Sequence, residues 1–285
     1  MRLVLLLLFA LVAAAILSSL FRRSDSRQNT VATAGKPQAT RIVSPQAAAK
    51  RAICLASLVL RAQAEYDLHP EPGDSPHGDR TGDPGFVERV KTWMKGEEFW
   101  EAASPRERSL LEKPLDSWSK QEIADGQWRE DALVVLLWAL QPDMKMPTYD
   151  EQASQSEVMK SVPHPAASQA FVANAKFRDP GEITNARDTA ELWLWRARTT
   201  QLQREHYKLP KGTDLERIVA ETAKKAQEER LFRAIDNDFP ALGKPYAKLS
   251  AEEWQTMRSI ATERLYAFNW ICGYAEDWDE VPAET

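Results

Sequence analysis

Charged and polar side chains that could hold a small molecule stand beside aromatic residues at several places in the sequence. Arginines follow tryptophans in the middle of the chain, and a Glu-Arg pair shortly precedes an Asn-Trp pair near its C-terminus. A guanidinium group and a carboxylate can together hold the polar groups of a ligand. The residues that we expect to line such a ligand or partner pocket are Trp128, Arg129, Arg196, Glu263, Arg264, Asn269, Trp278 and Asp279.

The same residues have a simpler interpretation as ion pairs and hydrogen bonds that orient helices and hold the acidic C-terminal tail. We favour it because nothing in the sequence fixes the separation of the carboxylates or raises a pKa, as acid–base catalysis requires. We therefore predict a non-catalytic binding or interaction module and assign no catalytic residue. The alternative is an enzyme that uses arginine and carboxylate side chains in an internal pocket on a small polar substrate.

Motifs of the common cofactor and nucleophile sites are absent from the sequence. The chain has no glycine-rich phosphate loop, no GxSxG turn and no HExxH pair. His69 and His77 share the proline-rich segment 67–85 with Asp74, Asp79 and Asp83, but metal ligands normally come from rigid, spaced positions. We therefore expect no cofactor and no bound metal.

The two cysteines, Cys54 and Cys272, lie far apart, each within an apolar helical pattern. This spacing excludes a CxxC motif and a disulfide-rich scaffold. Two buried free thiols are expected, with a Cys54–Cys272 disulfide as the alternative if the domain is exported.

Charge is distributed unevenly along the chain. Residues 1–44 carry six Lys/Arg and one acid, and the formal charge of the whole chain is -5, so the remainder carries -10. Nucleic-acid binding without sequence preference needs a basic surface. The acidic body therefore argues against a nucleic-acid partner and leaves an unknown protein or a small polar ligand, with the oligomeric state open.

The element that must organise the fold is a central helix predicted at residues 119–140. Ser119 and Glu122 have the spacing of a capping box, and Pro142 ends the helix because proline disfavours helical geometry in the residue before it. Every residue of 132–140 is apolar. A helix that is apolar on all sides lies inside a protein with other helices packed around it.

Helical spacing of apolar residues and cap signals predict further helices on both sides of the central one. No stretch shows the period-2 alternation of a strand between turns. The fold is therefore expected to be all-α, a single domain over residues 44–285 with about seven or eight helices around the buried central helix. The other helices are predicted near residues 44–64, 86–103, 104–111, 151–162, 179–205, 215–235 and 250–272, with a loop at 237–248.

The N-terminal residues 1–23 are predicted to form a membrane anchor or a signal peptide. The apolar run 3–21 is close to the roughly 20 residues that a membrane helix needs. It continues past the small residues at 13–15, where a signal peptide could be cleaved, so an uncleaved single anchor is favoured over a periplasmic or secreted protein. Basic residues after the run slightly favour a cytoplasmic domain, and residues 24–43 read as a flexible tether.

The sequence resembles domain-of-unknown-function family 4272 in two motifs, WREDALVVLLWAL (128–140) and ERLYAFNWICGYAEDWDEVPAET (263–285). Phe268 replaces a leucine of the family pattern, Glu280 and Glu284 replace aspartates, and Asp131 stands one place away from the family's acid–alanine order. The matching residues are Trp128, Arg129, Leu133, Trp138, Ala139 and Leu140 in the first motif, and Glu263, Arg264, Ala267, Asn269, Trp270, Trp278, Asp279, Val281 and Thr285 in the second.

The resemblance covers about residues 45–285 and is most specific in its C-terminal motif. It implies a helical domain that reaches the end of the chain, and it implies no established activity. Members of that family look mostly soluble, so the N-terminal anchor is a departure and the resemblance says nothing of the compartment.

Overall fold

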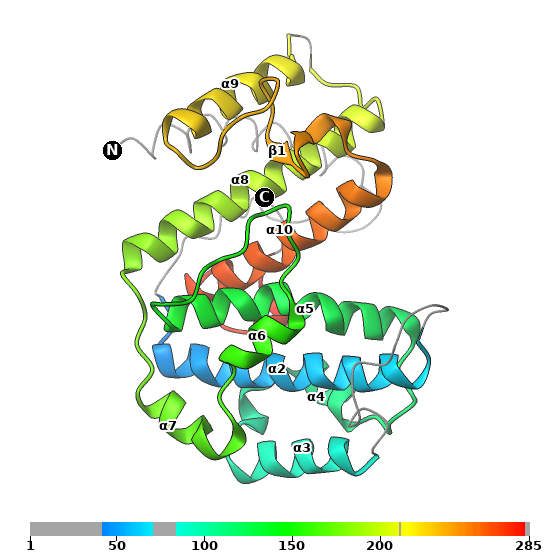
Figure 1. Ribbon diagram of the computed structural model, residues 1–285, viewed down its shortest axis with the longest axis vertical. Coiled ribbons are helices and arrows are strands. Elements are labelled where there is room, and N and C mark those ends of the chain that lie inside the picture. Colours follow the sequence, from blue (N-terminus) through cyan, green and yellow to red (C-terminus); the bar gives the residue numbers. More distant parts are fainter. Residues whose placement is uncertain (1–41, 71–83, 211, 283–285) are drawn as a thin grey trace, which may run out of the picture.

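The computed structural model of the protein describes residues 42–70, 84–210 and 212–282. They form an all-α fold (Figure 1), as the sequence predicts. The α-helices are α2 (Pro45–Leu68), α3 (Pro84–Gly96), α4 (Pro105–Glu112), α5 (Lys120–Leu140), α6 (Gln155–Ser161), α7 (Ser168–Ala173), α8 (Pro180–Arg204), α9 (Leu215–Glu228) and α10 (Ala251–Ile271). The 3₁₀ turns are η1 (Trp100–Ala102), η2 (Pro165–Ala167), η3 (Tyr246–Lys248) and η4 (Trp278–Glu280), and the strands are β1 (Pro240–Ala241) and β2 (Lys244–Pro245).

The central helix predicted at residues 119–140 is α5. Its capping box is formed by Ser119 and Glu122, and all of its residues from 130 to 140 are buried. Gly126 brings α5 close to α2, since a Cβ atom added there would lie 2.7 Å from the Cβ atom of Ala62. Any larger residue would push the two helices apart, so the glycine fixes their closest approach.

The long helices pack in the order α9, α8, α10, α5, α2 (Figure 1). Helix α5 contacts α2 on one side and α10 on another, and α8 packs against α10. The far side of α2 is covered by η1, α4 and α7. Because α2 and α5 are covered on several sides, the apolar residues of both helices form one continuous core with those of α8 and α10.

Two predicted helix ends were placed too late, because residues with left-handed backbone geometry interrupt the chain. The helix predicted at 86–103 ends at Gly96, since Glu98 has a φ of 61°, and the chain resumes as the short turn η1. The helix predicted at 215–235 ends at Glu228, and Arg230 follows with a φ of 63°. A local apolar pattern does not reveal such a reversal when the residue is not glycine.

The predicted loop at 237–248 contains a small hairpin that the sequence analysis missed. Strands β1 and β2 pair in antiparallel fashion. Leu242 and Gly243 connect them with φ angles of 52° and 73°, the geometry of a tight two-residue turn. Two-residue strands carry no detectable alternation, which explains why the pattern gave no signal.

Both cysteines are buried and free, as expected. The thiol of Cys54 donates a hydrogen bond to the backbone carbonyl of Phe99 at 3.3 Å. Burial raises the pKa of Cys54 to about 12 and that of Cys272 to about 11. Both thiols therefore stay protonated at neutral pH and fill space in the core.

Two predictions concern residues outside those that the structure describes. The anchor at 3–21 and the tether up to residue 41 lie there, and so does most of the histidine- and aspartate-bearing loop. Within the described ranges, no helix is long and apolar enough to cross a membrane, and no three His, Cys, Asp or Glu side chains are grouped to hold a metal. The chain enters the described domain beside the end of α10, where the amide of Val43 donates to the carbonyl of Ile271 at 2.9 Å.

Candidate functional site

The eight residues predicted to line a pocket are divided among separate places in the fold. Arg129, Glu263 and Arg264 lie at the contact between α5 and α10. Arg196 lies on α8 and pairs with a residue of the loop before β1. Asn269, Trp278 and Asp279 hold the C-terminal tail, as described below, and Trp128 is half-buried on α5 beside Arg129.

Arg264 forms a closed ion pair with Asp131. The Arg264 Nε atom donates to the Asp131 Oδ1 atom at 2.9 Å, and neither side chain is exposed to solvent. Nη1 and Nη2 donate to the backbone carbonyls of Pro147, Thr148 and Glu151 at 2.7 to 2.9 Å. Burial raises the pKa of Asp131, and Arg264 offsets part of that rise. This pair ties the loop after α5 to α10.

Arg129 on α5 pairs with Glu263 on α10, close to the Arg264–Asp131 pair in the sequence of both helices. Unlike that pair, it is partly exposed to solvent. The Arg129 Nη1 atom donates to both carboxylate oxygens of Glu263, at 3.1 and 2.9 Å. The Arg129 guanidinium lies over the ring of Tyr266, 5.5 Å from its centroid. Its side chain is 27% exposed, and Nε and Nη2 have no protein partner among the described residues. Burial raises the pKa of Glu263 to about 7, although Arg129 opposes the rise.

Glu130 lies between these two pairs in the sequence and has neither a hydrogen-bond partner nor an ion-pair partner in the described part of the chain. It is only 6% exposed. Four residues along α5 from Gly126, it lies on the side of α5 that faces α2. Burial, and then the neighbouring charge of Asp131, raise the pKa of Glu130 to about 8. Glu130 was not among the predicted residues, because a single carboxylate at this place in the helix belongs to no cap or recognised motif.

Arg196 is a structural residue of the far end of the domain. Its Nε and Nη2 atoms donate to the two carboxylate oxygens of Asp238 at 2.6 and 2.7 Å. Asp238 in turn accepts the amides of Phe239 and Ala247 at 2.7 and 2.8 Å, so it holds both ends of the hairpin segment. The guanidinium lies over the ring of Tyr246 at 5.0 Å. Asp238 could not be identified from sequence because its partner is 42 residues away.

The C-terminal tail is fastened by three of the predicted residues. Asn269 accepts a hydrogen bond from the Arg187 Nε atom and donates one to the carbonyl of Pro282, both at 2.9 Å. Trp278 is 2% exposed. Asp279 accepts the amide of Arg106 in the first turn of α4 at 3.1 Å, where an acidic group is favoured by the helix dipole.

Four arginines share one arrangement. Each pairs with a carboxylate, lies over an aromatic ring and donates to at least one backbone carbonyl of a turn. The arrangement satisfies most of the N–H donors that a guanidinium carries when water is excluded, although Arg51 Nε and Arg61 Nη1 have no acceptor in the described structure. The four are Arg51 (Glu107, Trp278, Ala102), Arg61 (Glu65, Trp118, Lys113 and Pro114), Arg178 (Glu182, Trp138, Gln141) and Arg264 (Asp131, Tyr149, Pro147).

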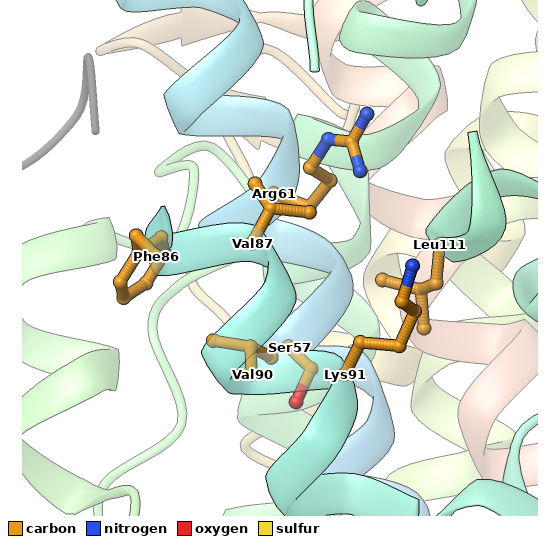
Figure 2. A pocket seen from close by; sticks show the side chains of 7 residues that line it. All are labelled: Ser57, Arg61, Phe86, Val87, Val90, Lys91 and Leu111. Carbon is orange, nitrogen blue, oxygen red and sulfur yellow. The ribbon is translucent and has the colours of Figure 1, made fainter. Parts of the chain in front are cut away.

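A hollow between α2, α3 and α4 is too small for a substrate (Figure 2). Its volume is about 10 Å³, close to the minimum that one water molecule needs. It is lined by Ser57, Arg61, Phe86, Val87, Val90, Lys91 and Leu111. None of the eight predicted residues lines it, so this hollow and the predicted residues are independent features.

Comparison with known proteins gives a family and no activity. A family described as Domain of unknown function (DUF4272) matches residues 26–221. The matched region includes the motif at 128–140 and ends before α10, so the motif at 263–285 lies outside it. No curated protein and no solved structure matches the chain.

Proposed function

This chain belongs to the DUF4272 family, and we propose that its helical domain is a non-catalytic binding module held at a membrane by residues 3–21. The apolar run there has about the length of a membrane helix. The basic residues that follow it favour a domain on the cytoplasmic side. A cleaved signal peptide, with a periplasmic or secreted domain, is the alternative.

The observation that carries the binding role is the open guanidinium of Arg129. The other predicted charged residues hold parts of this chain to one another, as Arg264 and Arg196 do. Arg129 keeps two nitrogen atoms for a group from outside, and its guanidinium lies over the ring of Tyr266. An arginine edge beside aromatic surface is typical of recognition sites.

Membrane attachment is tested by fractionation of cells that express the full chain. The protein is expected to stay in the membrane pellet through an alkaline carbonate wash, and its intact mass should include residues 1–21. A chain that starts at residue 24 is the control and should appear in the supernatant. If expression of the full chain gives a soluble protein that lacks its first residues, the anchor is contradicted.

The binding role is tested by thermal unfolding of the full chain in detergent against small acids, nucleotides and metal salts. A ligand raises the apparent stability by an amount set by its concentration relative to its Kd. A shift that is lost in Arg129→Lys supports the site. A ligand that binds equally well to this variant would place the binding elsewhere in the domain.

An enzyme that uses arginine and carboxylate side chains is the second candidate, and the pKa of Glu263 near 7 favours it. A carboxyl group that titrates near neutral pH can act as a general acid or base. This candidate predicts chemical turnover of a bound small molecule that Glu263→Gln abolishes while binding remains. Binding without turnover in the wild-type protein would contradict it.

A further inference from the structure

We propose that the free edge of Arg129 binds the backbone carbonyl groups of a turn in a basic partner polypeptide. This inference rests on the proposed binding role of the domain and names the kind of partner that the site would take. It is drawn from the way in which the same fold uses the four arginines with the shared arrangement.

The four arginines with the shared arrangement show one use that this chain makes of a guanidinium on an aromatic ring. Arg187 and Arg196 also lie over rings, those of Tyr274 and Tyr246, but they donate to side-chain acceptors. Arg61 pairs with Glu65, lies 5.2 Å from the centroid of Trp118 and donates to the carbonyls of Lys113 and Pro114 at 3.0 and 2.6 Å. Arg264 combines the same three kinds of contact, with carbonyls of the loop after α5. In each case the carboxylate and the ring orient the guanidinium, and its remaining edge holds a turn of the chain.

Arg129 has the first two contacts of this arrangement and lacks the third. Its carboxylate is Glu263 and its ring is Tyr266. In the described residues no carbonyl accepts from it, and its side chain is 27% exposed, whereas those of the other four arginines range from 0 to 12%. The oriented edge is therefore accessible from outside, and a turn of another polypeptide supplies the missing contact.

The charges around Arg129 select a basic partner over an acidic one. Three carboxylates surround Arg129 and Tyr266. The charge of the exposed Asp125 raises the pKa of Glu263, and the charges of Asp279 and Glu263 raise the pKa of Tyr266. The remainder of the chain beyond residue 44 carries -10. A second carboxylate placed on Arg129 would meet these charges, whereas a neutral carbonyl does not, and lysine or arginine side chains beside it are attracted.

The test is a selection from a displayed library of seven-residue loops closed by a disulfide, using the full chain in detergent micelles. Selected loops are expected to be rich in lysine and arginine. Their affinity should fall at least tenfold in Arg129→Lys, which keeps the charge and loses the planar fork. Arg258→Lys is the matched control, since Arg258 is an exposed arginine over the ring of Trp254, and it should leave the affinity unchanged.

A chemical change in the ligand separates a binding role from a structural one. In a selected loop, replacing one backbone amide by an ester weakens the carbonyl as an acceptor. The ester should reduce the affinity for the wild-type protein and have little further effect in Arg129→Lys. Circular dichroism should show that both protein variants are folded.

Two results would overturn the inference. Loops that bind Arg129→Lys as tightly as the wild-type protein would show that binding occurs elsewhere, and the proposed binding role would survive. A library that yields no binder would remove the turn-recognition site, while the thermal measurements with small ligands would still decide the binding role separately.

Discussion

Two ion pairs join helices α5 and α10 at neighbouring positions, and they differ in how far they are exposed to solvent. Arg264 and Asp131 are closed off from solvent, and each guanidinium nitrogen has an acceptor within the chain. Arg129 and Glu263 are partly open, and in the described residues only the Nη1 atom of the guanidinium has a hydrogen-bond partner. Glu130 lies between them in the sequence with no partner in the described structure. The comparison shows what decides the role of an arginine in this fold. An arginine that is buried with its N–H donors bonded within the chain is structural, whereas one that is partly exposed with unbonded donors is available to bind another molecule.

The closed pair should be the more costly to break. In Arg264→Met the Asp131 carboxylate is left buried without its cation, and removing one partner of a buried pair costs about 3–5 kcal/mol. We expect little folded protein, or a large loss of unfolding free energy in urea. The double variant Arg264→Met/Asp131→Leu removes both charges and should recover part of the loss. If Arg264→Met is as stable as the wild type, the buried pair contributes no more to stability than the partly exposed pair of Arg129 and Glu263.

The C-terminal tail is also held by a buried arginine. The ring of Trp278 lies under the guanidinium of Arg51, 4.9 Å from it. Trp278→Ala should lower the unfolding free energy by about 3 kcal/mol, since it removes a buried indole. Chemical denaturation measures the effect. Glu276→Ala, an exposed substitution in the same tail, is the control and should change little. If both variants unfold like the wild type, the tail does not contribute to the stability of the domain.

Glu130 predicts a dependence of stability on pH. Its folded-state pKa of about 8 lies above the usual 4.5, so the folded protein binds more protons than the unfolded chain between these values. The unfolding free energy should therefore fall as the pH rises from about 4.5 to about 8, by on the order of 1–3 kcal/mol. Glu130→Gln should flatten this slope. Equal slopes in the two proteins would show that Glu130 is ionised in the folded state throughout that range.

The smallest effect on stability is expected at the open pair. Arg129→Lys keeps a positive charge next to Glu263 and leaves no turn of the chain unsupported. Partly exposed ion pairs contribute about 1 kcal/mol or less, so the unfolding free energy should change by less than that. A loss as large as that of Arg264→Met would mean that Arg129 is structural, which would contradict the proposed binding edge.

Sequence reasoning predicted the helical framework well, because caps and apolar periodicity are local signals. The capping box of Ser119 and Glu122 begins α5, and the helix predicted at 250–272 is α10. The helix ends before Glu98 and Arg230 were misplaced. The left-handed backbone of these two residues depends on how the following segment packs, which the local sequence does not show. The two-residue strands of the hairpin were missed for a similar reason.

The site was only partly accessible from sequence. Arg129 and Glu263 form an ion pair and Arg196 belongs to another part of the domain, while the pocket itself stays a prediction. Asp238 and the carbonyls that bind Arg264 were not found, since their contacts join segments that lie far apart in the sequence. Arg51 and Arg61 lie at the two ends of the mostly apolar stretch 52–60, a signal that was not used.

Hydrogen exchange of the arginine side-chain Nε–H groups, measured by ¹⁵N NMR on the full chain, tests the central distinction most directly. The Nε–H group of Arg264 donates to a buried carboxylate, whereas that of Arg129 has no partner in the described structure. Exchange at Arg264 should be slower than at Arg129 by at least about 100-fold, because it requires an opening of the core. Similar exchange rates at the two sites would contradict the account.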